Sequence, residues 1–425
     1  MAEVSIPDFN NLKPSKEGSS NASASVANKR VLIVEDIGEM RLMLKSLMTS
    51  LGYSKIEIEP SGQAALKRIL EGRYDIVLSD YNLGGSVDGQ QLLEITRKTY
   101  SLDHSTIFMM ITADTAYEAV VSALEYQPDS YLVKPFPPES FMRRLGRVIK
   151  QKQAFHNLNQ ARLNEDWDQV MEEAKYVMSK HAPYASLCLK SIGEALFAKG
   201  EYKQAKTHYM LITQKHKNLA WAYYGIAQCE MEMEQYAGAA KNLQTTINLS
   251  RHFLSAYDLL ADAYEKLEDL EQAQAVLRSV LEVSPRSPER SKRMGDISAK
   301  LNDWSSAEQA YGRVIRVSRD TINETVEMYY DHLQAITNLI NSGEEGKTLN
   351  DKFKRSLTRL RIIGKASPVS VTNSFRIEVQ QYVTRNHMGE AIKTWHNWNR
   401  LIADGKASPL SEGQEYSLKK RLGLL

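Results

Sequence analysis

Five polar residues in the first third of the chain could together bind a metal ion and a phosphoryl group. They are Glu35, Asp36, Asp80, Thr112 and Lys134, and each one ends or directly follows a short apolar run. In an open α/β sheet, ligands bind where parallel strands end at their carboxyl edge. Carboxylate oxygens suit a hard divalent cation, while a hydroxyl and an ammonium suit phosphoryl oxygens. We therefore expect these side chains to converge on one small pocket with that chemistry.

The elements that must position these residues alternate strictly between strand-like and helical stretches. The apolar, strand-like runs are 30–35, 54–59, 75–79, 106–111 and 130–133. The amphipathic, helical stretches are 38–50, 61–71, 89–99, 115–125 and 138–150. Alternation of this kind, with very apolar strands, is typical of a parallel sheet that is covered by helices on both faces. The sequence predicts one α/β domain with a doubly wound, five-stranded parallel sheet.

A 34-residue period replaces the strand signal after residue 150. Four registers share this spacing, and small residues occupy two of them while larger apolar residues occupy the other two. The registers are Ala205, Ala239, Ala273 and Ala307; Gly193, Ala227, Ala261 and Gly295; Tyr202, Tyr236, Leu270 and Trp304; and Tyr209, Leu243, Leu277 and Tyr311. Small residues let two antiparallel helices approach closely, and larger ones fill the gap to the next pair, so the period predicts an all-α solenoid.

The turns of this solenoid are predicted at sequences such as those around Gly200 and Asn302. A less regular early copy surrounds Trp167, and a late copy is suggested near Ala391. The periodicity fades between residues 320 and 371, although that stretch still has a helical pattern.

Bulk properties limit the possible classes of protein. With 425 residues the chain is too long for one ordinary core, so two or three domains are expected. No apolar run approaches the roughly 20 residues that span a bilayer, and the N-terminus lacks a secretory signal, so we expect a cytoplasmic protein. Cys188 and Cys229 lie in helical patterns and are predicted to be small buried thiols. The net charge of +2 argues against a general nucleic-acid binder.

Because these motifs fall at the ends of the predicted strands, residues 30–150 resemble the flavodoxin-like receiver domain of two-component response regulators. Residues 151–322 resemble tetratricopeptide repeats. The chain as a whole is similar to bacterial regulators that join the two. We expect residues 1–29 to be a disordered tail and residues 323–425 to be a helical region with degenerate repeats.

The resemblance implies a role for each acidic residue. Asp80 matches the phosphoacceptor of the family, whose carboxylate attacks a phosphohistidine and becomes an acyl phosphate. Asp36 and Asp80 would ligate Mg²⁺ directly, together with the backbone carbonyl of Asn82, and Glu35 would act through water. The chemistry is also reasonable without the family, because a divalent ion relieves the repulsion among three carboxylates.

The resemblance also assigns the residues around the phosphoryl group. Thr112 matches the hydroxyl that binds one phosphoryl oxygen, and Lys134 matches the lysine that pairs with another. The Lys134–Pro135 bond matches one that is cis in the family. Tyr131 matches an aromatic switch residue whose position is coupled to the hydroxyl.

Two departures from the family pattern concern the site. Glu35 stands where Asp is commonest. The loop after Asp80 lacks the usual proline and reaches Gly89 one residue later than the pattern, and we expect Gly84 and Gly85 to absorb the extra residue.

These features predict a response regulator whose output is protein binding. A sensor histidine kinase or a phosphotransfer protein would phosphorylate Asp80, and the repeats would bind a protein whose identity the sequence leaves open. The chain would catalyse only its own phosphotransfer and dephosphorylation. Coupling is expected through helix 138–150, which continues with little break into residues 151–153. Phosphorylation could alternatively pair two receivers in a homodimer.

Two other functions remain open at this point. The chain could be a phosphate sink or a kinase inhibitor docked through its repeats, because Asn82 and Asp114 occupy positions that tune hydrolysis in the family. It could also contact nucleic acid or an acidic partner through a basic run at 352–365. Residues 351–425 hold 14 Lys and Arg against 6 Asp and Glu, an excess of 14 − 6 = 8. The simpler interpretation is that this run is the solvated face of a helix that closes the solenoid.

Overall fold

The computed structural model describes residues 26–84, 87–99, 102, 105–113, 128–285, 287–320, 324–344 and 346–425. The chain divides into two compact units, one that reaches Leu267 and one from Glu268 to Leu425. Within the described residues, no helix is both long enough and apolar enough to cross a bilayer.

A five-stranded, fully parallel sheet forms the first part of the first unit. Its strands are β1 Arg30–Val34, β2 Lys55–Glu59, β3 Ile76–Asp80, β4 Ile107–Thr112 and β5 Ser130–Val133. They lie in the order β2-β1-β3-β4-β5. This confirms the predicted doubly wound α/β fold, and it places the carboxyl ends of β1, β3, β4 and β5 along one edge.

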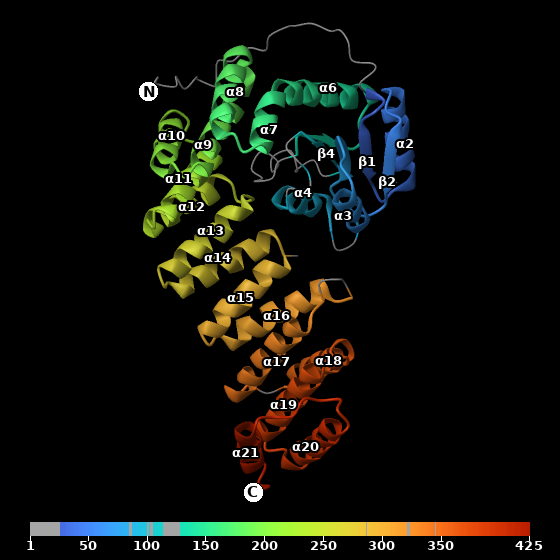
Figure 1. Ribbon diagram of the computed structural model, residues 1–425, viewed down its shortest axis with the longest axis vertical. Helices are drawn as coiled ribbons and strands as arrows, with labels where there is room; N and C mark the ends of the chain where they lie inside the picture. The colour runs from blue at the N-terminus through green and yellow to red at the C-terminus, as the bar shows by residue number, and fades with distance from the viewer. Residues whose placement is uncertain are drawn as a thin grey trace. The chain divides into compact units, whose positions relative to one another are not determined.

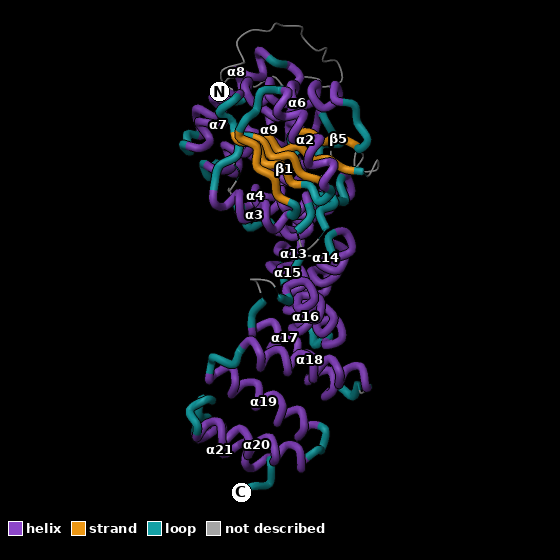
Figure 2. The backbone as a smooth tube through the Cα atoms, turned by 90° about the vertical axis from the view of Figure 1, so that its right-hand side faces the viewer, coloured by secondary structure: helices purple, strands orange, loops and turns teal. Residues whose placement is uncertain are grey.

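Helices cover both faces of this sheet (Figure 2). Helices α2 Gly38–Ser50 and α6 Pro138–Ala154 pack on one face, and α3 Gly62–Glu71 and α4 Gly89–Lys98 pack on the other. Successive strand residues point to opposite faces, so Phe108 and Met110 of β4 join one core while Met109 and Ile111 join the other. The predicted helix 115–125 lies outside the described residues.

Helix α6 continues beyond the predicted end at residue 150. It ends at Ala154, and α7 His156–Leu163 begins two residues later. The residue between them, Phe155, is buried in an apolar cluster with Leu158 and contacts the ring of Tyr184 edge-on at 5.6 Å. The prediction of little break at this junction is confirmed. Phe155 lies between α6, which packs on the sheet, and the helices that follow.

The rest of the chain forms consecutive helices that pair within each unit (Figure 1). The first unit continues with α8 Trp167–Lys180, a 3₁₀ turn Ala182–Tyr184, α9 Ala185–Ala198, α10 Tyr202–Lys215, α11 Ala220–Glu232, α12 Tyr236–Leu249 and α13 Leu254–Lys266. The second unit contains α14 Leu270–Val283, α15 Pro288–Lys300, α16 Trp304–Ser318, α17 Val326–Asn341, α18 Lys347–Ile363, α19 Pro368–Thr384, α20 Met388–Ala403 and α21 Glu412–Arg421. The all-α prediction for this part is confirmed.

Residues with positive φ recur at the predicted turn spacing. Gly200, Glu234, Glu268 and Asn302 are 34 residues apart and have φ of 77°, 57°, 60° and 57°. The late copy shows the same feature at Asn386, where φ is 58°. Positive φ favours Gly and Asn, yet two of these turns carry Glu, which adopts this backbone conformation only with some strain.

Close contacts between a glycine and a tyrosine explain two of the four periodic registers. A Cβ added to Gly193 would lie 2.4 Å from the ring of Tyr209, and one added to Gly295 would lie 2.5 Å from the ring of Tyr311. The rings therefore occupy the space that any larger residue at the glycine positions would need.

We expect Gly295→Ala to lower the free energy of unfolding by about 1–3 kcal/mol, because the new methyl group overpacks against the Tyr311 ring. The matched control is Gly389→Ala in α20, where an added Cβ meets nothing within 4 Å. That change should be neutral or slightly stabilising, because Ala favours a helix over Gly by about 1 kcal/mol. Urea unfolding of the full chain, followed by circular dichroism, compares the two. Equal midpoints for both variants would contradict the packing account.

The two cysteines are buried, free thiols, as predicted. Both Cys188 and Cys229 are fully buried in helices of the first unit. Burial raises the pKa of each thiol to about 12. The thiolate is the reactive form, so neither cysteine is suited to redox or nucleophilic chemistry at neutral pH.

Candidate functional site

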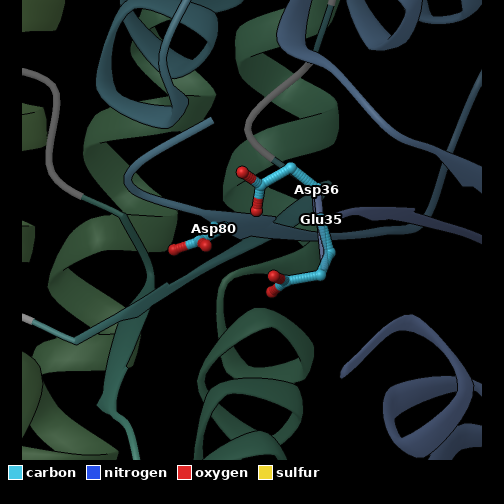
Figure 3. Close-up of side chains that lie close together, drawn as sticks. All are labelled: Glu35, Asp36 and Asp80. Atoms are coloured by element: carbon cyan, nitrogen blue, oxygen red, sulfur yellow. The ribbon is translucent and has the colours of Figure 1, made fainter. Parts of the chain in front are cut away.

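Three carboxylates meet at the carboxyl edge of the sheet. Glu35 and Asp36 follow β1, and Asp80 is the last residue of β3, the strand beside β1. Their ligand oxygens lie within 4.8 Å of one another (Figure 3). Glu35 and Asp80 are buried, whereas Asp36 is exposed. This oxygen donor set fits a hard divalent cation such as Mg²⁺, with the exposed carboxylate on the solvent side.

Lys134 brings a positive charge to the two buried carboxylates. It follows β5, and its Nζ donates hydrogen bonds to Glu35 Oε2 at 2.8 Å and to Asp80 Oδ2 at 2.9 Å. Its backbone N–H donates to the carbonyl of Thr112 at 2.7 Å. The peptide bond to Pro135 is cis, as the resemblance implies. One ammonium thus bonds two of the three clustered carboxylates, and the cluster keeps an excess of negative charge when all three are ionised.

The electrostatics reflect this imbalance. Burial raises the pKa of Glu35, and the Lys134 ammonium only partly counteracts that rise, while the charge of Asp80 adds to it. Burial alone would lower the pKa of Lys134, but its hydrogen bonds to Glu35 and Asp80 outweigh that effect and the pKa is raised. The lysine therefore stays charged, and the carboxylates would gain most from a second cation.

Thr112 and Tyr131 lie on the two strands nearest Lys134. Thr112 ends β4 and is fully buried, and it pairs with Val133 of β5 in the sheet. Tyr131 is half-buried, and the guanidinium of Arg144 on α6 lies 5.0 Å from the centre of its ring. The predicted switch residue is thus in direct contact with the helix that leads to the repeats.

The loop after β3 approaches the site through its backbone. The exposed Asn82 donates its N–H to Asp80 Oδ1 at a long 3.4 Å. A Cβ added to Gly89 would lie 2.0 Å from the carbonyl oxygen of Asp80, so only glycine fits there. The sequence identified Gly89 only as the glycine that ends the loop pattern, and it did not predict the close approach of Gly89 to the Asp80 carbonyl.

From the sequence, we expect Gly84 and Gly85 to absorb the extra loop residue through unusual backbone angles. The structure does not show such an angle at Gly84, the one of the two that lies within the described residues. Gly84 does not have a positive φ, and a Cβ there would lie 3.9 Å from Asp36 Oδ2. Gly85 lies outside the described residues, as does Asp114.

One residue near the site was missed by sequence reasoning. Arg41 of α2 donates from Nη1 to the carbonyl oxygens of Glu35 at 2.8 Å and Asp36 at 2.9 Å. The sequence feature that could have identified Arg41 is a basic residue in the first turns of a helix, where the helix dipole disfavours positive charge.

Comparison with known proteins agrees with this geometry. Residues 31–146 match the model of the response regulator receiver domain, and residues 254–287 match that of the tetratricopeptide repeat. The chemotaxis protein CheY-3 of Vibrio cholerae is 31% identical over 124 residues, which are 29% of this chain and 94% of that protein. The chain belongs to the response regulator receiver family.

Two further relatives of this response regulator cover the same region. The chemotaxis protein CheY of Pseudomonas aeruginosa is 27% identical over 122 residues, 29% of this chain and 97% of that protein. A solved structure of the chemotaxis response regulator CheY4 of Vibrio cholerae is 28% identical and covers 28% of this chain and 98% of its own, with a TM-score of 0.26. The matched part is the receiver, and tetratricopeptide repeats follow it in this regulator.

Half of the basic residues in the run 352–365 form ion pairs within the second unit. All of this run except its last two residues lies on α18, where Lys352, Arg359 and Arg361 each contact an acidic residue of another helix or loop. The pairs are Lys352–Glu308 at 2.8 Å, Arg359–Glu324 at 2.7 Å with a further contact to Asp320, and Arg361–Glu378 at 2.6 Å. These contacts favour a structural role for half of the run, while Lys354, Arg355 and Lys365 are exposed. The expectation that this helix closes the solenoid is wrong, because α19, α20 and α21 follow α18 and α19 packs against it.

The Arg359–Glu324 pair predicts how acid affects the regulator. Two hydrogen bonds from Arg359 lower the pKa of Glu324 from 4.5 to about 2. Because the folded-state pKa is depressed, the pair stabilises the fold above pH 4.5, and this contribution is lost as the pH falls towards 2. Solvent screens this pair, so we expect Glu324→Gln to lower the free energy of unfolding by only about 1 kcal/mol at neutral pH and to show a flatter loss of stability between those pH values. Urea unfolding at several pH values measures this, with the exposed Glu344→Gln as control, and parallel profiles for wild type and Glu324→Gln would contradict it.

Proposed function

We propose that this response regulator accepts a phosphoryl group on Asp80 in a Mg²⁺-dependent reaction and transmits the event through protein binding by its repeats. In this proposal the receiver spans residues 30–150 and the repeats begin at 151. The observation that carries it is the convergence of Glu35, Asp36 and Asp80 at the carboxyl edge of a receiver sheet, where the Lys134 ammonium bonds the first and the last of them.

The proposed reaction is a simple displacement at phosphorus. A carboxylate oxygen of Asp80 attacks the phosphoryl group of a phosphohistidine, the new O–P bond forms and the N–P bond breaks. The imidazole nitrogen leaves with the bonding electron pair and is protonated by solvent. The donor is a sensor histidine kinase or a phosphotransfer protein.

The residues around Asp80 would lower the barrier mainly by electrostatics and positioning. A Mg²⁺ ion held by Asp36, Asp80 and the carbonyl of Asn82, with Glu35 acting through water, would neutralise charge on the phosphoryl oxygens. Lys134, already within 2.9 Å of Asp80 Oδ2, would pair with one phosphoryl oxygen. The Thr112 hydroxyl at the end of the adjacent strand would bind another.

The response would pass along β5, because this short strand is attached at both ends. Lys134 follows it at the site, and Asp129 precedes it at the other end. Asp129 Oδ1 pairs with Lys152 of α6 at 2.7 Å, and Asp129 Oδ2 accepts the backbone N–H of Phe108 at 2.8 Å. Lys152 lies in the last turn of α6, three residues before Phe155 and the first helical pair.

Movement of Lys134 towards a phosphoryl group would therefore change the contacts of β5 with the end of α6, next to the repeats. The Tyr131–Arg144 contact gives a second connection from the same strand to the same helix. Two arrangements of β5 against α6 would present the repeats differently, and phosphorylation would shift the population between them. Pairing of two receivers is the alternative form of output.

An affinity experiment with two baits tests this function. Wild-type chain with beryllofluoride and Mg²⁺ mimics the phosphorylated state, and Asp80→Ala cannot form it. We expect a set of proteins whose recovery from lysate differs between the baits, and a bait truncated after residue 150 should lose them. The same recovery with both baits would contradict phosphate-dependent binding. Recovery of a histidine kinase alone, with rapid loss of the phosphoryl group, would instead support a phosphate sink.

A further inference from the structure

Arg41 holds the backbone of the acidic pair rather than its side chains. Its Nη1 donates to the carbonyl oxygen of Glu35 at 2.8 Å and to that of Asp36 at 2.9 Å. Both distances are those of good N–H···O bonds, and a charged donor makes such bonds stronger than neutral ones. The side chain is partly buried, with Nη2 beside Gly38, where an added Cβ would lie at 3.5 Å.

These two carbonyls define the orientation of Asp36. The carbonyl of Glu35 belongs to the peptide plane before the Asp36 Cα, and the carbonyl of Asp36 belongs to the plane after it. Each peptide unit is rigid, so fixing both planes fixes the direction in which the Asp36 Cβ leaves the backbone. One guanidinium nitrogen therefore sets where this carboxylate points.

Asp36 depends on such a constraint more than the other two carboxylates do. Asp80 belongs to β3, and the side chain of Glu35 is bound by Lys134. Asp36 is exposed, lies after the end of β1, and precedes Ile37, the N-cap residue of α2, which provides no side-chain cap. A connection of this kind between a strand and a helix can rotate its peptide planes unless hydrogen bonds hold them.

We propose that Arg41 is a positioning residue that orients Asp36 for Mg²⁺ by fixing the peptide planes on both sides of its Cα. This inference rests on the proposed metal-dependent function of the site. Residues that orient metal ligands typically change metal affinity by about 10–100-fold when they are removed.

The sign of the effect separates positioning from simple charge. Removing a positive charge near a cation site reduces repulsion, so a purely electrostatic role for Arg41 predicts tighter Mg²⁺ binding in Arg41→Ala. A positioning role predicts weaker binding. Arg41→Lys keeps the charge but loses the planar guanidinium and its reach, so positioning predicts weaker binding for this variant also.

Isothermal titration of the full chain with MgCl₂ tests the inference. We expect the Mg²⁺ dissociation constant to rise about ten-fold in Arg41→Ala and by a smaller factor in Arg41→Lys. The matched control is Arg143→Ala, an exposed arginine of α6 that donates to Ser140 Oγ at 3.2 Å. It should bind as wild type does. Thermal midpoints in EDTA establish that each variant folds, and if Arg41→Ala does not fold, Arg41→Lys decides.

Three outcomes overturn the inference in distinguishable ways. Equal or tighter Mg²⁺ binding by Arg41→Ala, with normal binding by wild type, refutes the role of Arg41 alone and leaves the proposed function intact. Absence of Mg²⁺ binding by the wild-type chain refutes the metal site itself. Weaker binding by Arg41→Ala accompanied by an equal weakening in Arg143→Ala also overturns it, because the effect is then not specific to the acidic pair.

Discussion

Replacing Lys134 with alanine is expected to slow phosphorylation of Asp80 by acetyl phosphate about 100-fold or more. The ammonium lies 2.8 Å from Glu35 and 2.9 Å from Asp80, and it would stabilise the charge that gathers on the phosphoryl oxygens. Loss of one well-placed electrostatic group in a preorganised site typically costs a factor of about 10²–10³. The variant should also raise the pKa of Glu35 further, because the buried carboxyl would lose the group that keeps its pKa down.

Intact mass spectrometry over a time course gives the labelling rate of each variant. Lys45→Ala, which removes an exposed lysine of α2, is the control and should label at the wild-type rate. A circular dichroism spectrum shows whether Lys134→Ala keeps its fold. Labelling of a folded Lys134→Ala at the wild-type rate would show that the lysine has no part in the transfer.

A Gly/Ser linker in place of residues 149–153 is expected to abolish phosphate-dependent partner binding while leaving phosphorylation intact. The replacement removes Lys152 and with it the 2.7 Å contact to Asp129, and it interrupts α6 just before Phe155. The site residues all lie before this segment, so the chemistry at Asp80 should be unaffected. Binding of partners should become the same with and without beryllofluoride.

A finer pair of variants separates the ion pair from the helix. Lys152→Gln removes the α6 charge that faces Asp129 and leaves the Arg97–Asp129 contact at 3.4 Å in place, whereas Lys150→Gln changes an exposed lysine of the same helix. We expect the first to weaken the difference in binding between the two phosphorylation states and the second to preserve it. Retained phosphate dependence in the linker variant would exclude coupling through α6 and would favour pairing of receivers.

The local parts of the fold were predictable because hydrophobic periodicity is a property of neighbouring residues. Strand β5 matched its predicted range 130–133, and α2 matched 38–50. The repeats were equally predictable from the sequence. The contact between Gly193 and Tyr209 recurs three periods later between Gly295 and Tyr311. The convergence of Glu35, Asp36 and Asp80 followed from strand order, since β1 and β3 are adjacent.

Contacts between elements far apart in the sequence could not be predicted from hydrophobic periodicity. Lys152 meets Asp129, and Arg41 meets two backbone carbonyls, because of the length and rotation of particular helices. The buried His332, which bonds both Ser356 and Glu308 across three helices of the second unit, gave no sequence signal either. Side chains at such positions look like ordinary surface or core residues until their partners in space are known.

Phosphorylation of the purified chain is the most direct test of the central claim. Wild-type protein should be incubated with acetyl phosphate, with and without Mg²⁺, beside the Asp80→Asn variant and an established response regulator as positive control. The account predicts a mass increase of about 80 Da that requires Mg²⁺, maps to Asp80 and is absent from the variant. No increase in the wild-type chain, under conditions in which the positive control is labelled, would contradict it.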